Sequence, residues 1–263
     1  MKVPQLLYGQ NLSNQQKLFN FFATIGGIFV FIIDYFKYVF IPPFEIEETK
    51  KHMADFGIKT LPIVSTMGII VGFVMALQSY VVLEPLGATD FIPGSLGISI
   101  LREFAPILTA LLFAGRVSSG IGAELGSMRV TEQIDAMEVS GIDPFKFLVV
   151  PRVTASTFIL PLLTVYVVVI SLFGGFIATF LQEQMNVIYF FNSMISYITM
   201  GDIFQGMIKT FFFGFAVGIV GSYKGYTTEG GTVGVGISTT SSVVIASLLI
   251  IFIDMIMVKL GMM

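Results

Sequence analysis

The sequence predicts an all-α integral membrane protein: an N-terminal interfacial helix, five transmembrane helices, and a short cytoplasmic helix between the second and third spans. Of the 263 residues, 55% are hydrophobic and only 12% are charged, whereas an average soluble domain has about 25% charged residues. The mean hydropathy is +0.88. A soluble protein of this size could not bury so much apolar surface, so the chain must reside in a membrane.

The spans follow from the positions of the charged residues. A helix needs about 20 apolar residues to cross the hydrocarbon core. The second span can cross the membrane only if Arg102, Glu103 and Arg116 are tolerated in or near the bilayer. The fourth span can cross only if Lys209 is tolerated there. Residues 184–201 are rich in Asn, Ser and Thr, which favours an interfacial segment over a sixth span. The five expected spans are about 58–83, 94–126, 147–181, 202–223 and 236–260.

The first apolar stretch lies within an expected helix at about 14–40, which ends in charged residues followed by Ile41-Pro42-Pro43. We interpret it as an amphipathic helix in the membrane interface. A secretory signal is disfavoured because no small-residue cleavage site follows. With no repeats or flexible linkers, residues 1–263 are expected to form a single domain.

The loop charges predict the orientation. The loops at 84–98 and 182–202 contain no Lys or Arg, whereas basic residues gather before residue 60 and in the loop at 124–152. The positive-inside rule therefore predicts a cytoplasmic N-terminus, and five spans then place the C-terminus on the outer side of the membrane.

Composition also excludes several kinds of chemistry. There is no cysteine and a single histidine, His52, and the net charge is −3. We therefore expect no catalytic residue, no metal site and no nucleic-acid partner. The glycine-rich segment 230–236 lacks the Gly-Lys-Ser/Thr ending of a phosphate-binding loop, so no ATP site of that type is expected in this chain.

The charges inside the spans are candidates for function because a charge at the bilayer centre costs about 2.5–3.5 kcal/mol. Arg102 and Glu103 lie early in the second span, Lys209 lies in the fourth and Asp254 lies late in the fifth. The simplest neutral arrangement pairs Arg102 or Lys209 with Glu103 or Asp254. Such pairs could hold helices together or form a polar patch in a substrate cavity, and the sequence leaves both readings open.

The cytoplasmic loop contains a predicted short helix at about 131–141. Thr131 is its expected N-cap, Gly141 suits the left-handed position after its end, and Asp143-Pro144 resembles the start of the next helix. The helix displays Glu132, Asp135 and Glu138, and it is interpreted either as a solvated connector or as a docking helix for a cytoplasmic partner.

Small residues recur every four positions along the second span. This spacing allows two helix backbones to approach closely, within the subunit or across a dimer. The residues assigned to helix packing are Gly115, Ser118, Gly122 and Gly126.

One stretch, strongest over 97–152, resembles the signature of MlaE/YrbE permeases, the membrane subunits of ABC transporters that move lipids between Gram-negative membranes. The resemblance covers nearly the whole chain. It is carried by Leu101-Arg102-Glu103-Phe104-Ala105-Pro106, by Ala123-Glu124-Leu125-Gly126-Ser127-Met128-Arg129, by Gly141-Ile142-Asp143-Pro144 and by Val150-Pro151-Arg152.

The resemblance implies a homodimer with phospholipid in a cavity at the dimer interface. It implies an MlaF-like ATPase that docks on the helix at 131–141 through Thr131, Glu132, Asp135 and Glu138, and carries the ATP and magnesium. It also implies a hexameric MlaD-like MCE protein on the periplasmic side, and allows for an MlaB-like STAS protein. The lipid-cavity residues it implies are Leu77, Gln78, Val81, Arg102, Glu103 and Asp254.

One departure concerns the last span, where the family often has basic residues after Gly-Val-Gly. Here Ile237 and Ser241 stand at those positions, which puts any cytoplasmic charge contact there in doubt.

Three other interpretations are compatible with an apolar, multi-span chain. A secondary transporter would use the span charges for ion coupling, but no inverted repeat is visible. An intramembrane enzyme lacks a nucleophile or base, and a structural scaffold would require another protein to carry the lipid.

Overall fold

The computed structural model describes residues 14–261, which contain helices and no strand. Five helical segments in that range are long and apolar enough to cross a membrane. The all-α membrane fold class predicted from the sequence is therefore confirmed. The five segments are Ile46–Leu86, Thr89–Val130, Phe145–Glu183, Met200–Tyr226 and Gly231–Leu260.

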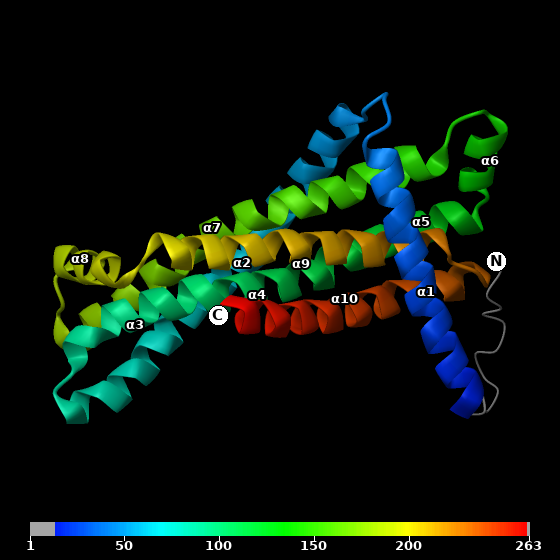
Figure 1. Ribbon diagram of the computed structural model, residues 1–263. Coiled ribbons are helices and arrows are strands. Elements are labelled where there is room, and N and C mark those ends of the chain that lie inside the picture. The colour runs from blue at the N-terminus through cyan, green and yellow to red at the C-terminus, as the bar shows by residue number, and fades with distance from the viewer. Residues whose placement is uncertain (1–13, 262–263) are drawn as a thin grey trace. The chain divides into compact units, whose positions relative to one another are not determined.

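The spanning segments extend beyond their apolar stretches into polar residues at one or both ends, and Figure 1 labels the α-helices. The α-helices are α1 (Asn14–Val39), α2 (Ile46–Leu83), α3 (Ile92–Ser99), α4 (Ala105–Phe113), α5 (Ser119–Val130), α6 (Gln133–Val139), α7 (Val150–Glu183), α8 (Val187–Tyr197), α9 (Met200–Tyr226) and α10 (Gly231–Gly261). Short 3₁₀ turns are η1 (Glu84–Leu86) and η2 (Thr89–Phe91), and π-helical turns are η3 (Ile100–Phe104), η4 (Ala114–Ser118) and η5 (Phe145–Val149).

Two of the π-helical turns precede a proline. Pro106 follows η3 and Pro151 follows η5, and neither has an N–H to donate to the carbonyl four residues back. The helix instead closes one residue wider, with the Ala105 N–H reaching the Ile100 carbonyl. Such single wide turns often lie at functional positions, and η3 carries Arg102 and Glu103.

The chain divides into two compact units, which are described separately. Unit 1 comprises Met1–Ala54, Ala114–Ser156 and Phe215–Leu248, and unit 2 comprises Asp55–Phe113, Thr157–Gly214 and Leu249–Met263.

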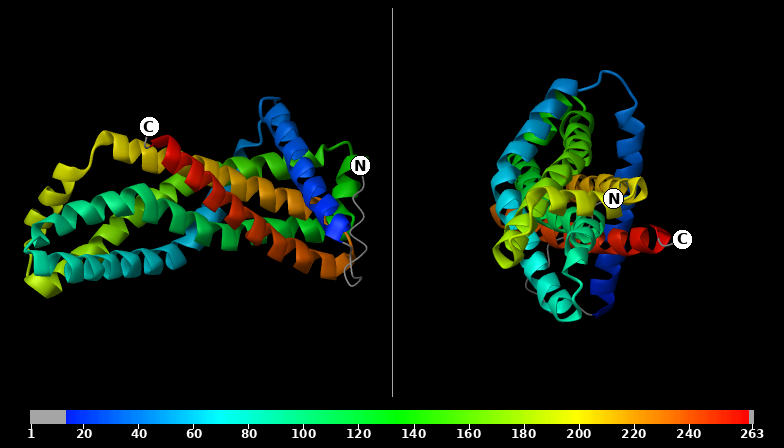
Figure 2. Two further views of the ribbon diagram at one scale, coloured as in Figure 1. Left: turned by 60° about the horizontal axis from the view of Figure 1, so that its bottom comes forward. Right: turned by 90° about the vertical axis from the view of Figure 1, so that its left-hand side faces the viewer.

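In unit 1, α1 crosses its neighbouring helices at a steep angle (Figures 1 and 2). The Phe31 ring meets the Phe145 ring edge-on, with centroids 4.7 Å apart. The hydroxyls of Tyr35 and Thr154 are hydrogen-bonded at 3.0 Å. These contacts fix α1 on the start of α7 and the end of α9, around a buried core of Phe31, Tyr35, Val149, Val153 and Ile219.

In unit 2, glycines bring helices into backbone contact. A Cβ on Gly72 of α2 would lie 1.7 Å from the Ser171 carbonyl oxygen of α7, so only glycine fits there. Helices α3 and α8 lie side by side (Figures 1 and 2). Gly97 allows this close approach because it has no side chain: a Cβ there would lie only 2.5 Å from Met194 Cγ.

Helix α8 does not form a sixth span. Its 11 residues extend only about 17 Å, well short of the roughly 30 Å of a bilayer core. Asn186 caps its start by accepting the Ile188 N–H at 2.8 Å. The Tyr189 hydroxyl donates to Asp90 at 2.9 Å, and this bond raises the pKa of Tyr189. Residues 184–201 thus contain no helix long enough to cross a membrane, in line with the sequence-based prediction.

Candidate functional site

The strongest candidate site is a group of charged side chains in unit 2, centred on Lys209 of α9. The Lys209 side chain is only 2% exposed, and its Nζ lies 2.8 Å from Glu103 Oε2 and 2.9 Å from Asp254 Oδ1. Three helical segments far apart in sequence thus share one buried cation. The expectation that opposite charges of the spans lie together is met, with Lys209 in the central role.

A second pair stands beside this group. Arg102 binds Asp202 through both Nε and Nη2, which contact the same carboxylate oxygen. The other oxygen of Asp202 accepts the backbone N–H and the hydroxyl of Thr199, each at 2.7 Å. Thr199 and Asp202 therefore form a capping box at the start of α9.

Asp202 was not among the residues identified from the sequence. The sequence did contain a pattern that could have identified it: Thr199-Met200-Gly201-Asp202 has the spacing of a capping box directly before an apolar run. The sequence offered either Arg102 or Lys209 as the partner of Glu103 and Asp254; the structure gives that place to Lys209, and Arg102 pairs with Asp202 instead.

The backbone explains why these charges meet. A Cβ on Gly206 would lie 2.4 Å from the Leu101 carbonyl oxygen, so α9 packs directly against the wide turn η3. Asp202, Gly206 and Lys209 are four and three residues apart and lie on one face of α9. That face meets Arg102 and Glu103.

The five charged residues of this group are Arg102, Glu103, Asp202, Lys209 and Asp254, and they carry one net negative charge. Lys209 and Asp202 are enclosed, whereas the side chains of Arg102 and Glu103 are 46% and 40% exposed. The site thus has a buried, neutralised half and an open half that presents a guanidinium and a carboxylate.

The residues expected from α2 do not join this site within one chain. Leu77 packs against the apolar core of unit 2, and Gln78 and Val81 are exposed. Three pockets, lined around Val64, Asn186 and Ile41, include none of the six lipid-cavity residues.

Helix α6 runs over Gln133–Val139 (Figure 1). Thr131 is not its cap, because the Thr131 hydroxyl donates to the Ser127 carbonyl and ends α5 instead. Glu132 occupies the N-cap position with a left-handed φ of 59°. Asp135 forms an ion pair with Arg129, a contact that fixes α6 against the end of α5.

The other end of α6 matches the expectation. Gly141 has a φ of 79°. Its N–H donates to the Glu138 carbonyl and the Ile142 N–H to the Met137 carbonyl, which together make a Schellman motif. Asp143 then caps the next helix, accepting the N–H groups of Phe145 and Lys146.

Of the four small residues assigned to helix packing, which lie in η4 and α5, three make close contacts. A Cβ on Gly122 would lie 3.2 Å from Ser242 Oγ, and one on Gly126 would lie 3.0 Å from Thr228 Oγ1. The Ser118 carbonyl accepts the Ser242 hydroxyl at 3.1 Å. Gly115 has open space around it among the described residues, so the structure does not bring it into packing within the chain.

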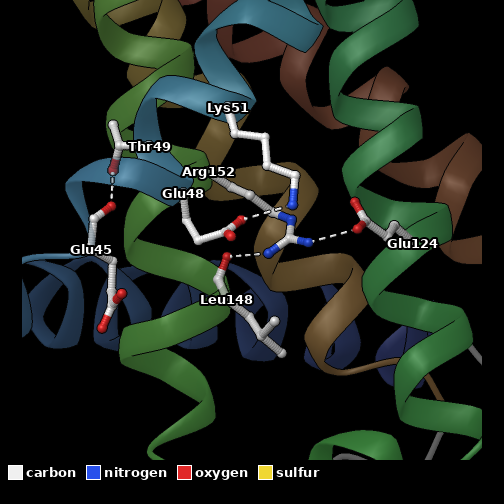
Figure 3. A network of polar contacts seen from close by, with 7 residues as sticks. All are labelled: Glu45, Glu48, Thr49, Lys51, Glu124, Leu148 and Arg152. Carbon is white, nitrogen blue, oxygen red and sulfur yellow. Dashed lines mark hydrogen bonds and ion pairs between the residues drawn. The ribbon is translucent and has the colours of Figure 1, made fainter.

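A further ion pair in unit 1 was also missed (Figure 3). Arg152 of α7 is buried and donates to Glu124 of α5 and to the Leu148 carbonyl, each at 2.7 Å. This pair ties together the two helices that flank α6.

Comparisons with known proteins agree with this architecture. The family described as Permease MlaE matches residues 49–260. The chain belongs to the MlaE permease family. It is 34% identical to the intermembrane phospholipid transport system permease protein MlaE of Haemophilus influenzae, over 79% of this chain and 80% of that protein. It is 40% identical to a probable ABC transporter permease protein of Synechocystis, over 78% of each chain.

The part that matches the MlaE family contains both the charged group and α6. It also contains the two replaced positions of the last helix. Ile237 and Ser241 lie in α10, where the Ser241 hydroxyl donates to the Ser238 carbonyl of its own helix. This MlaE-family chain therefore has no cation at either position.

Proposed function

We propose that this chain is the membrane permease subunit of an ABC transporter that moves phospholipids between the inner and outer membranes. Membership of the MlaE family is the observation that carries the proposal, together with the phospholipid transport named for the Haemophilus relative. The five apolar helices fit a permease embedded in the membrane. The chain itself catalyses nothing, and a separate ATPase subunit binds ATP and magnesium.

The ATPase contacts α6 and the residues just before it. Three acidic residues, Glu132, Asp135 and Glu138, lie on seven consecutive positions there. The Schellman motif at its end and the Arg129–Asp135 pair at its start give this short helix a defined shape, which a solvated connector does not require. The Arg152–Glu124 pair supports the two flanking helices, so force applied at α6 would pass into α5 and α7.

The transported lipid occupies a cavity between two copies of the chain. Gln78, Val81, Arg102 and Glu103 are exposed on the single chain, so a second copy is needed to enclose them. Arg102 offers a cation to the lipid phosphate and Glu103 an acceptor to headgroup donors, while Leu77 and Val81 offer apolar surface to acyl chains. Asp254 holds Lys209 and thereby positions Glu103.

On the periplasmic side, an MCE protein of the MlaD type receives the lipid, and an MlaB-type STAS protein binds the ATPase. The N-terminus is cytoplasmic and the C-terminus periplasmic. The absence of basic residues from the loops at 84–98 and 182–202 supports this orientation.

The test is reconstitution of this chain with the ATPase and MCE proteins encoded beside it. Transfer of labelled phospholipid should require ATP and cease with an ATPase variant that cannot hydrolyse it. A secondary transporter using Glu103, Lys209 and Asp254 for proton coupling would instead work without ATP under a proton gradient. Transfer driven by the gradient alone would reject the ABC proposal.

A further inference from the structure

A pocket of about 370 Å³ lies within unit 1, where the end of α1, the beginning of α2 and the beginning of α7 meet. Most of its wall is apolar and includes Ile41, Phe44 and Val150. Its charged residues are Lys50, Lys146 and Glu45. None of these residues belongs to the proposed lipid-cavity site or to the proposed ATPase contact.

The lining charges favour a ligand with one negative charge. Two lysines against one glutamate leave the lining with a single net positive charge. Lys50 also lies 3.5 Å from Glu47, but both side chains are well exposed, and exposed pairs of this kind contribute little. The Asp143 carboxylate accepts the backbone N–H groups of Phe145 and Lys146 and also meets the lining residue Tyr38, but Asp143 itself does not line the pocket.

The surroundings of the pocket suit a lipid better than a soluble anion. Phe40, Phe44 and Ile46 expose most of their side chains to the outside around the loop between α1 and α2. Exposed large apolar residues next to lysines are typical of the membrane boundary, where the lysine stem lies along apolar surface and the ammonium meets phosphate. Basic pockets between membrane helices on the cytoplasmic side bind anionic headgroups.

We propose that this pocket binds a monoanionic phospholipid of the leaflet that loop charge assigns to the cytoplasm. Lys50 and Lys146 hold the phosphate, and the apolar wall holds the first part of the acyl chains. The bound lipid connects α1 to α2 and α7, and it is distinct from the lipid that is transported. The inference goes beyond the proposed function and stands on unit 1 alone.

The experiment measures lipid binding to the full-length purified chain by native mass spectrometry, with phosphatidylglycerol and phosphatidylethanolamine supplied in equal amounts. Wild type should retain phosphatidylglycerol in preference. Lys50→Ala and Lys146→Ala should each weaken its binding about fivefold, and the double variant about 25-fold.

Lys51→Ala is the matched control. Lys51 is 74% exposed, close to the 68% of Lys50, but it does not line the pocket. Figure 3 shows it reaching toward Glu48 instead. Binding to this variant should stay within about twofold of wild type, since the charge it removes lies outside the pocket.

A shape variant tests the apolar wall. Thr49 lines the pocket, so Thr49→Trp should obstruct part of it and weaken binding while both lysines remain. Three results would overturn the proposal: equal retention of the two lipids, an equal loss in Lys51→Ala, or unchanged binding in Thr49→Trp. Displacement by inorganic phosphate at the concentration of the lipid would do so too, because the apolar wall would then contribute nothing.

Discussion

Lys209 is the residue whose removal tests the charged group most directly. Its Nζ is the partner of both Glu103 and Asp254, at 2.8 and 2.9 Å. Replacement by methionine keeps most of the side-chain volume and removes the charge. Glu103 and Asp254 would then face each other without a cation between them.

The magnitude follows from that geometry. With both oxygens within hydrogen-bond distance of one atom, the carboxylates lie at most about 6 Å apart, where like charges repel by about 3 kcal/mol at an effective dielectric constant of about 20. Breaking a buried pair typically costs about 3–5 kcal/mol. Because Glu103 is 40% exposed, water relieves part of the cost, and we expect the lower figure.

The assay is reversible unfolding of the purified chain in mixed micelles. Lys209→Met should lower the free energy of unfolding by about 3 kcal/mol, or roughly 150-fold in the equilibrium constant. The control is Lys59→Met, because Lys59 and Asp55 form an exposed pair whose loss should cost less than about 1 kcal/mol.

A compensating variant completes this test. Adding Glu103→Gln and Asp254→Asn to Lys209→Met removes all three charges, and should return stability to within about 1 kcal/mol of wild type. If Lys209→Met is no more damaging than Lys59→Met, or if the neutral triple variant is as unstable as the single one, the electrostatic reasoning is wrong.

Three further predictions concern assembly, coupling and transport. Gly122→Leu should destabilise the chain by about 2 kcal/mol or more, because the new side chain would press on α10. Gly120→Leu is the control and should not destabilise the chain, because Gly120 faces open space. Chemical denaturation of the two variants makes the comparison. Reversing Glu132 and Asp135 to lysine should release the ATPase or abolish its stimulation, as measured by co-purification and phosphate release; normal values for both would reject α6 as the docking helix. Glu103→Gln should leave assembly intact, because Lys209 still forms its ion pair with Asp254. The variant should lower phospholipid transfer at least several-fold. Normal transfer would show that Glu103 is not on the lipid path.

The fold class could be predicted from composition because the hydrocarbon core leaves few choices. Twenty apolar residues between charges form a spanning helix, since backbone groups cannot remain unpaired in lipid. The ends of the helices were less predictable. α2 begins at Ile46 rather than near residue 58, because Glu and Lys are good helix formers that carry the helix beyond its apolar part.

The candidate site could be predicted only in part. Charges inside spans identified Arg102, Glu103, Lys209 and Asp254, but a one-dimensional pattern does not tell which cation meets which anion. Asp202 was not identified from the sequence because it lies at the edge of a span, where a charged residue costs little free energy and does not stand out as functional. Its pairing with Arg102 depends on how closely α9 approaches η3, and that distance is set by Gly206.

The same limit explains the misplaced cap of α6. Thr131 has the residue type of an N-cap, yet its hydroxyl serves the Ser127 carbonyl at the end of α5. Helices α5 and α6 meet at this point. The hydroxyl of a threonine between them can donate a hydrogen bond to a carbonyl of the preceding helix or accept one from an N–H group of the following helix. Glu132 makes the turn itself in a left-handed conformation, which residue preferences would not have favoured.

Stability alone does not account for the arrangement of the charged group. A buried ion pair is often no better than apolar residues of the same volume, so five charged residues would be a poor way merely to join helices. Lys209 is enclosed and neutralised, as a structural pair requires, but Glu103, which it binds, and Arg102, which Asp202 binds, keep their side chains nearly half exposed. The enclosed half holds the open half in position, which suits a site that must present fixed charges to a lipid headgroup. The neutral triple variant separates the two roles: if it folds but no longer transfers phospholipid, the charges serve transport, and if it folds and transfers normally, they serve only the fold.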